Sequence, residues 1–272
     1  MFGYQSRMAN LAAALALVLA LVVVLFPFAW VFLESLKPPD LAGRPELRAF
    51  APTAQHWSDV IGSDVPSNIA NSFAVAAVTV AIALAVGCPA AYAFSRYRDI
   101  RRLRYAILAA TMLPPAILIL PFFLLLYQMA MIDTRTGVVL AHLSFVVPVV
   151  TWFLIGFFDE VPRELEQQAM IDGCTRMQAF RRVILPNVRP GIGAAAIFGF
   201  VLSWNDLFYA LLLTGGDSRT LPVAIAGFWT FRGIDLGKTA AAIMLAIGPV
   251  LILSFLVQKH LVRGLGGGAL KS

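Results

Sequence analysis

The chain has 272 residues, of which 60% are hydrophobic and only 13% are charged. Soluble domains are roughly 45–50% apolar and about 25% charged, so the composition excludes an ordinary soluble protein and indicates one whose surface faces lipid. The net charge of +6 would suggest nucleic-acid binding in a soluble chain. In a membrane protein the basic residues mark topology instead, and no nucleic-acid partner is expected.

Six stretches are long and apolar enough to cross a bilayer, which takes about 20 residues. We predict spans at residues 8–33, 66–94, 105–131, 137–158, 190–213 and 239–258. The first run is too long for the apolar core of a signal peptide, so we expect it to be a retained helix. The sequence therefore predicts an all-α integral membrane protein, with residues 1–272 forming one transmembrane domain.

The basic residues are unevenly distributed between the segments that connect these spans. Fourteen of the 21 Lys and Arg residues lie in the N-terminus, in the segments after the second and fourth spans, and in the C-terminal tail. Because cytoplasmic loops carry the excess of Lys and Arg, both termini are predicted to be cytoplasmic.

The third predicted span contains Pro114, Pro115 and Pro121. Proline removes a backbone donor, so this helix should kink or break. Such a break can serve packing alone, or it can line a wet cavity at membrane depth.

The longest predicted cytoplasmic segment, residues 160–186, has the pattern of a helical hairpin. Asp159 and Glu160 suit a helix start, and Gly173 suits a helix end. Thr175 and Gln178 form a capping box that predicts a second helix, which Leu185 and Pro186 should end. The hairpin could rest on lipid headgroups, or it could dock a cytosolic partner.

This hairpin resembles the EAA loop of binding-protein-dependent ABC importer permeases. The matching residues, in order and spacing, are Ala169, Asp172, Gly173, Phe180, Leu185 and Pro186. Gln167 and Gln168 stand where the motif has Glu and Ala, and Glu166 is adjacent. The resemblance implies that these residues, with Glu166 and Gln167, form the coupling site for an ATPase.

Other features resemble the shorter membrane subunit of maltose-type carbohydrate importers, over essentially the whole chain. They are the Ser-Trp-Asn-Asp run at 203–206, an aromatic loop before the last span, and the Val-Arg-Gly-Leu tail at 262–265. The likeness implies a type I ABC importer permease fold with six transmembrane helices, in a bacterial inner membrane. It also implies transport of a sugar, oligosaccharide or polyol.

The resemblance implies several partners. They are a second, longer permease subunit, two copies of a cytosolic ABC ATPase, an extracytoplasmic solute-binding protein and membrane lipid. ATP and Mg²⁺ would be bound by the ATPase, and this chain would need no cofactor of its own. As a transport subunit it should not be an enzyme, and it should not hydrolyse ATP itself, since Lys271-Ser272 follows Leu270 and lacks the preceding glycine of a phosphate-binding loop.

Two further groups of residues are candidates for function. Asp206 is the only carboxylate inside a predicted span, and with Ser203 and Asn205 it could line a translocation path or be a solvated group near the interface. In the loop before the last span, Phe228, Trp229 and Phe231 could dock the binding protein or anchor the membrane interface.

Two other classes of protein are alternatives. A secondary transporter or channel would work without an ATPase, but it commonly shows paired repeats and several buried ionisable groups. A membrane serine hydrolase would need a paired nucleophile and base, and the sequence offers only the presence of Ser203 and His142. The three histidines, His56, His142 and His260, lie in different regions and form no ligand cluster.

Overall fold

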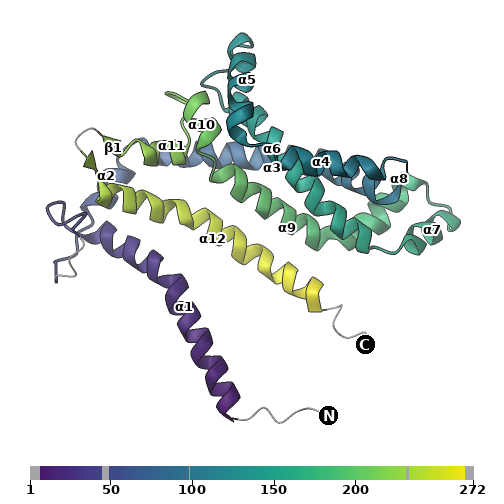
Figure 1. The fold of residues 1–272 in the computed structure, drawn as a ribbon, viewed down its shortest axis with the longest axis horizontal. Coiled ribbons are helices and arrows are strands. Elements are labelled where there is room, and N and C mark those ends of the chain that lie inside the picture. The colour runs from purple at the N-terminus through teal and green to yellow at the C-terminus, as the bar shows by residue number, and fades with distance from the viewer. Residues whose placement is uncertain (1–6, 45–48, 98, 231–232, 267–272) are drawn as a thin grey trace. The chain divides into compact units, whose positions relative to one another are not determined.

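The computed structural model describes residues 7–44, 49–97, 99–230 and 233–266. The described chain is mostly helical, with one short two-stranded hairpin (Figure 1). It divides into two compact units: residues 1–65 with 225–247, and residues 66–224 with 248–272.

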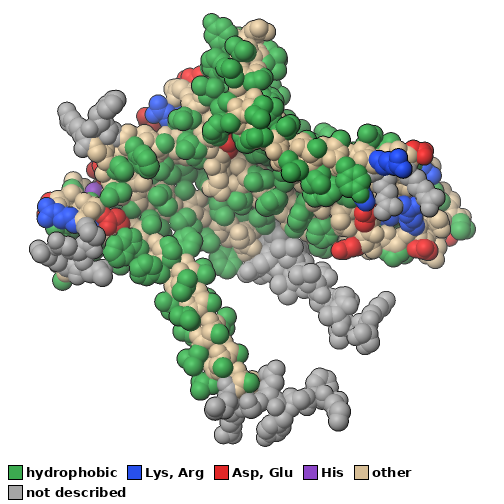
Figure 2. Space-filling view, in the orientation of Figure 1, with side chains coloured by type: hydrophobic (Ala, Val, Ile, Leu, Met, Phe, Trp, Pro, Cys, Tyr) green, Lys and Arg blue, Asp and Glu red, His purple; other side chains and the backbone are tan. Residues whose placement is uncertain are grey.

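The first unit is built around one long apolar helix. Its elements are α1 (Arg7–Leu36), α2 (Gln55–Ile61), the antiparallel strands β1 (Trp229–Thr230) and β2 (Gly233–Ile234), and the first turns of α12 (Leu236–Gly266). The Trp57 indole donates a hydrogen bond of 3.1 Å to Ser35 Oγ, which ties α2 to the end of α1. The rest of α1 exposes Leu and Val side chains over several turns, as Figure 2 shows, and such a surface requires lipid or another chain.

The second unit contains most of the helices. They are α3 (Val65–Arg96), the 3₁₀ turn η1 (Arg101–Leu103), α4 (Arg104–Thr111), α5 (Pro115–Gln128), α6 (Arg135–Glu160), α7 (Arg163–Ile171), α8 (Arg176–Ala179), the π-helical turn η2 (Phe180–Ile184), α9 (Leu185–Trp204), α10 (Phe208–Leu213) and α11 (Leu221–Ala226), with the end of α12.

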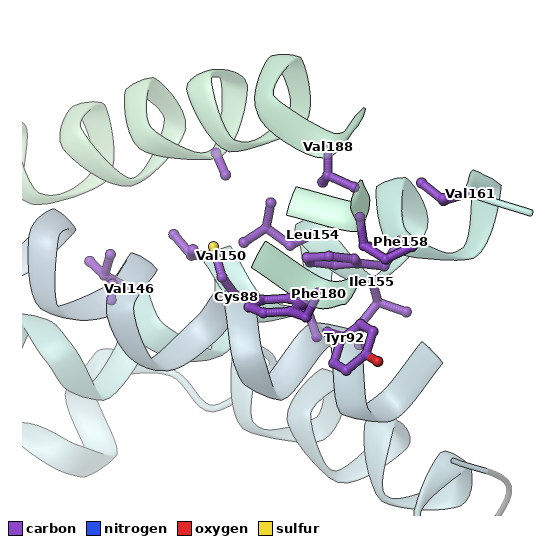
Figure 3. Close-up of a cluster of buried hydrophobic side chains, with 14 residues drawn as sticks. Cys88, Tyr92, Val146, Val150, Leu154, Ile155, Phe158, Val161, Phe180 and Val188 are labelled. Atoms are coloured by element: carbon purple, nitrogen blue, oxygen red, sulfur yellow. The ribbon is translucent and has the colours of Figure 1, made fainter. Parts of the chain in front are cut away.

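The core of the second unit lies between α3, α6 and α9 (Figure 3). Val150 and Leu154 of α6 are fully buried there. Helix α9 approaches α6 closely at Gly199, where an added Cβ would lie 3.0 Å from the Val150 side chain. The close approach of α9 and α6 therefore depends on a residue without a side chain.

The sequence predicts six spans, and the described helices offer five or six that could cross a membrane. Five described helices are long and apolar enough to cross a bilayer, and a sixth span is possible if α4 and α5 are counted as one broken span. The two halves of this pair are bent by 92°, and Pro114 has extended backbone dihedrals at the break. The predicted disruption of the third span is therefore confirmed.

The start of the hairpin differs from the prediction. Asp159 and Glu160 are the last residues of α6, and α7 begins only after the extended residues Val161 and Pro162. Acidic side chains are unfavourable at a helix C-terminus. Asp159 is compensated there by an ion pair of 3.3 Å with Arg104.

The end of the hairpin also differs, because Leu185 and Pro186 do not end a helix. The chain continues from η2 directly into α9. The Leu185 N–H donates to the carbonyl of Phe180, five residues back, so the bonding pattern shifts by one residue before the proline is reached. This π-helical turn lets the helix continue past a residue that has no N–H of its own.

The fifth predicted span, residues 190–213, is not one continuous helix. Helix α9 ends at Trp204, and α10 starts at Phe208 after a short non-helical stretch. We call residues 205–207 the α9–α10 break. Asp206 lies in its middle.

Candidate functional site

The turn of the hairpin has the caps that its sequence predicts. Gly173 has φ +89°, and the N–H groups of Gly173 and Cys174 donate to the carbonyls of Met170 and Ala169. These two bonds form a Schellman motif, which ends α7. The capping box of Thr175 and Gln178 then starts α8, with both reciprocal hydrogen bonds present. The hairpin therefore has a defined shape.

Glu166 of α7 points into the protein. It is 8% exposed, and its Oε1 accepts a short hydrogen bond from the Tyr92 hydroxyl. Its Oε2 lies 3.1 Å from Arg96 Nε, an ion pair without hydrogen-bond geometry. Arg96 also donates to the carbonyl of Val161. Glu166 thus ties the hairpin to the end of α3.

Gln167, at the position of the motif glutamate, lies on the exposed side of α7. Glu166 does not supply a charge on that side, because its carboxylate is buried. The spacing in the sequence is consistent with an inward direction of Glu166. Glu166 and Ala169 are three residues apart, so they share one face of the helix, and Ala169 is buried.

Phe180 fastens the other arm of the hairpin to the core. Its ring centroid lies 4.7 Å from that of Tyr92 on α3 and 6.3 Å from that of Phe158 on α6 (Figure 3). Ile184, one turn later, is fully buried. The hairpin is therefore packed against two spans, and it should move with them as a rigid element.

The remaining surface of the hairpin is available for contact. Ile171 is 84% exposed and Met177 is 60% exposed, which is unusual for large apolar side chains outside a span. Asp172 and Gly173 lie beside them on the exposed turn. Lys and Arg side chains, drawn in blue, gather near the same end of this unit in Figure 2.

The second candidate region is the α9–α10 break. The carboxylate oxygen Oδ2 of Asp206 accepts from the N–H groups of Tyr209 and Ala210, at 3.1 and 3.2 Å, and so caps α10. The same oxygen lies 3.2 Å from Nε2 of His142, whose Nδ1 lies 2.7 Å from Ser203 Oγ. Asn205 is exposed. Ser203 and Asp206 are thus brought together, with His142 between them.

The sequence prediction groups Ser203, Asn205 and Asp206 and does not include His142. An ionisable residue inside an apolar span is the same signal that singled out Asp206. The trio has the residue types of a serine hydrolase, but Ser203 is 4% exposed, so its hydroxyl is closed to a substrate.

A third carboxylate, Asp133, fixes the loop between α10 and α11. Its oxygens accept from the N–H groups of Gly215 and Gly216 and from the Ser218 hydroxyl, at 2.6 to 3.0 Å. These donors lower the pKa of Asp133 from 3.8 to about 2, with the Ser218 hydroxyl the largest cause. The Asn71 amide of α3 holds the same loop through two backbone carbonyls.

The aromatic loop before α12 forms the β1–β2 hairpin of the first unit. Trp229 is 67% exposed and Phe228 is half-buried, while Phe231 lies outside the described residues. Close by in this unit is an open pocket of about 460 Å³, lined by polar residues that include His56, Asp59 and Lys238. Among the residues that the structure describes, no three His, Cys, Asp or Glu side chains gather as a metal site.

Comparison with known proteins identifies the family. Residues 77–267 match the family described as binding-protein-dependent transport system inner membrane component. The chain belongs to this family. It is therefore a multi-pass transport subunit of the inner membrane and not an enzyme.

Relatives and a solved structure agree with this assignment. The chain is 35% identical to the trehalose transport system permease protein SugB of Mycobacterium tuberculosis, over 91% of this chain and 92% of SugB. It is 32% identical to the diacetylchitobiose uptake system permease protein DasC of Streptomyces coelicolor, with the same two coverages. A bacterial ABC transporter involved in alginate import has the same fold, with a TM-score of 0.71 at 20% identity, over 95% of this chain and 98% of that chain. The type I permease fold predicted from the sequence is confirmed.

Proposed function

We propose that this chain is the permease subunit of an ATP-driven importer that receives a sugar, oligosaccharide or polyol from a binding protein. The observation that carries the proposal is the fastening of the hairpin to the spans by Glu166, Arg96 and Phe180. A rigid hairpin can transmit a rigid-body movement between a soluble motor and the spans, which a loose loop could not. The carbohydrate class is supported by the names of relatives that transport trehalose and diacetylchitobiose.

The proposal assigns the exposed face of the hairpin to an ATPase. Ile171 and Met177 supply apolar area for docking, and Gln167 supplies uncharged hydrogen-bonding groups. ATP and Mg²⁺ are bound by that partner, present in two copies. A second permease subunit of the longer class completes the path and covers apolar helix faces such as that of α1.

The orientation follows from the distribution of charge. With both termini in the cytoplasm, the hairpin lies on the ATP side and the β1–β2 hairpin lies outside. Trp229 then presents a large aromatic surface to the binding protein, a residue type that is enriched where interfaces bind most strongly.

Isolation of the intact complex tests this proposal. A tagged chain is purified from its native membrane in mild detergent, and the complex is weighed by native mass spectrometry. We expect one copy of this chain with one longer permease and two ATPase subunits. Purification of a fully active carrier that contains this chain alone would overturn the proposal and favour a secondary transporter.

A further inference from the structure

A cavity of about 410 Å³ lies between the end of α3 and the second arm of the hairpin. We call it the α3–hairpin cavity. Its lining residues are Pro89, Tyr92, Tyr97, Arg176, Met177, Phe180 and Arg181. Apolar and aromatic side chains thus form most of the wall, and the two arginines are its charged lining residues.

The two arginines are not neutralised within the chain. Arg176 donates a hydrogen bond of 2.9 Å to the Tyr97 hydroxyl, and its guanidinium carbon lies 5.4 Å from the centroid of the same ring. These contacts hold the guanidinium beside the end of α3 but leave its charge in place. Arg181 is exposed, and neither arginine forms an ion pair within the part of the chain that the structure describes. The cavity therefore favours an anionic group.

A second, smaller cavity extends the positive surface. It has a volume of about 190 Å³ and shares Tyr97 and Arg176 with the first. Its charged lining residues are three arginines and one carboxylate, that of Glu166. Because this carboxylate is already paired with Arg96, it does not compensate the charge of Arg176.

An exposed apolar strip on α3 leads away from the arginines. Ile82, Val86 and Pro89 are four and three residues apart, so they lie on one face of the helix, and all three are exposed. Ile82 lies about 20 Å along α3 from Arg96, at 1.5 Å per residue. Half of the hydrocarbon core of a bilayer is about 15 Å thick. If Arg96 lies at headgroup level, the strip therefore extends to the depth that an acyl chain reaches.

We propose that the α3–hairpin cavity binds an anionic phospholipid of the cytoplasmic leaflet. Its phosphate contacts Arg176 and Arg181, and one acyl chain follows Val86 and Ile82 along α3. Guanidinium groups match phosphate oxygens in geometry and charge, and basic pockets on the cytoplasmic side of membrane proteins suit such headgroups. A soluble anion would leave the apolar strip uncovered. Only the side of the membrane rests on the proposed function.

The test measures binding of phosphatidylglycerol to the complete importer. The complex is purified in detergent, depleted of lipid and titrated with phosphatidylglycerol, and bound lipid is counted by native mass spectrometry. Phosphatidylcholine with the same acyl chains is the probe without net charge. We expect a site that prefers phosphatidylglycerol.

Two variants remove the charges of the cavity. Arg176→Gln and Arg181→Gln should each weaken binding of phosphatidylglycerol about fivefold, the size expected for one basic residue near a lipid surface. Arg182→Gln is the matched control, because Arg182 is an exposed arginine of η2 that does not line the cavity. It should leave the affinity unchanged. Equal binding of the two lipids, or an equal effect of Arg182→Gln, would overturn the inference.

The position of the acyl chain is tested by cross-linking. Phosphatidylglycerol with a photoreactive diazirine in its acyl chain should label the peptide that contains residues 82–89. Labelling only elsewhere, or displacement of the lipid by soluble glycerol 3-phosphate, would contradict a lipid site. Loss of the ATPase from both arginine variants with unchanged lipid binding would assign the cavity to that partner instead. These measurements require no transport, so a negative result leaves the proposed function standing, whereas that function fails on the subunit composition of the complex.

Discussion

Two carboxylates, the buried Glu166 in the hairpin and the partly buried Asp206 in the α9–α10 break, each hold a helix in place, but they use their oxygens differently. Glu166 uses both oxygens, one on Tyr92 and one on Arg96. Asp206 places all three of its donors on one oxygen and leaves the other open. The two oxygens of Glu166 therefore hold two separate side chains of α3, whereas one oxygen of Asp206 holds both the start of α10 and the His142 ring.

The difference assigns different roles to the two regions. The hairpin is built to keep its shape and to move with α3 and α6. The break is built to keep a polar group in a fixed direction inside a span. Substitutions that remove or weaken the contacts of one region should therefore affect the two regions differently.

The largest effect is expected from Glu166→Gln. Loss of the carboxylate leaves Arg96 buried without a counter-ion, which should destabilise the protein by about 3–5 kcal/mol. Thermal unfolding in detergent and the yield of co-purified ATPase measure this effect. Glu164→Gln, an exposed change on the same helix, is the control and should change neither.

A double substitution tests whether the Glu166–Arg96 ion pair is what holds the hairpin in place. Glu166→Met combined with Arg96→Met removes both charges together, so it should be less destabilising than Glu166→Gln alone. Equal or greater loss of stability in the double variant would show that the ion pair is not what fastens the hairpin.

A smaller effect is expected at the turn of the hairpin. Gly173 has φ +89°, and no atom lies within 4 Å of an added Cβ, so the cost of substitution is backbone strain alone. Gly173→Val should cost roughly 1–2 kcal/mol and reduce the amount of ATPase that co-purifies. Gly173→Asn should retain most of the binding, because Asn tolerates this backbone region. Equal loss in both variants would mean that the turn itself is not important for docking.

Asp133 extends the comparison to an exposed carboxylate with both oxygens in use. Its folded pKa of about 2 lies below the ordinary 3.8, so its stabilising effect is complete above pH 4 and is lost as the pH falls from about 4 to 2. The effect should be about 1 kcal/mol, because water screens an exposed group. Hydrogen exchange of residues 214–221 across this pH range measures it, and Asp133→Asn should remove the pH dependence. If the pH dependence of hydrogen exchange persists in Asp133→Asn, another titrating group causes it.

The smallest effect is expected from Ser203→Ala. This variant removes the hydrogen bond to His142 Nδ1 and leaves the bond to Asp206 in place. Uptake per ATP should stay within about fivefold of the wild type, since loss of a neutral hydrogen bond costs about 1 kcal/mol. A larger loss would show that the Ser203 hydroxyl does more than hold the His142 ring.

The sequence predicted those features that depend on local pattern. Gly173, the Thr175–Gln178 capping box and the proline break in the third span each depend on residues within one turn or loop, so their geometry follows from backbone chemistry. The apolar spans follow from length and composition in the same way.

The features that could not be predicted from the sequence depend on packing between distant segments. His142 and Asp206 are 64 residues apart, and their contact requires the close approach of α9 to α6 at Gly199. The inward direction of Glu166 depends on Arg96 and Tyr92, which lie on another span. The helix through Pro186 continues because η2 shifts the hydrogen-bond register, and no single residue type specifies such a shift.

The central claim is that this chain moves solute only as part of an ATP-driven assembly. The most direct test is uptake of radiolabelled sugar into liposomes that contain this chain, the second permease and the ATPase, with binding protein outside and ATP inside. The account predicts uptake with all components and none when any one is omitted. Uptake by this chain alone, without ATPase or ATP, would contradict it.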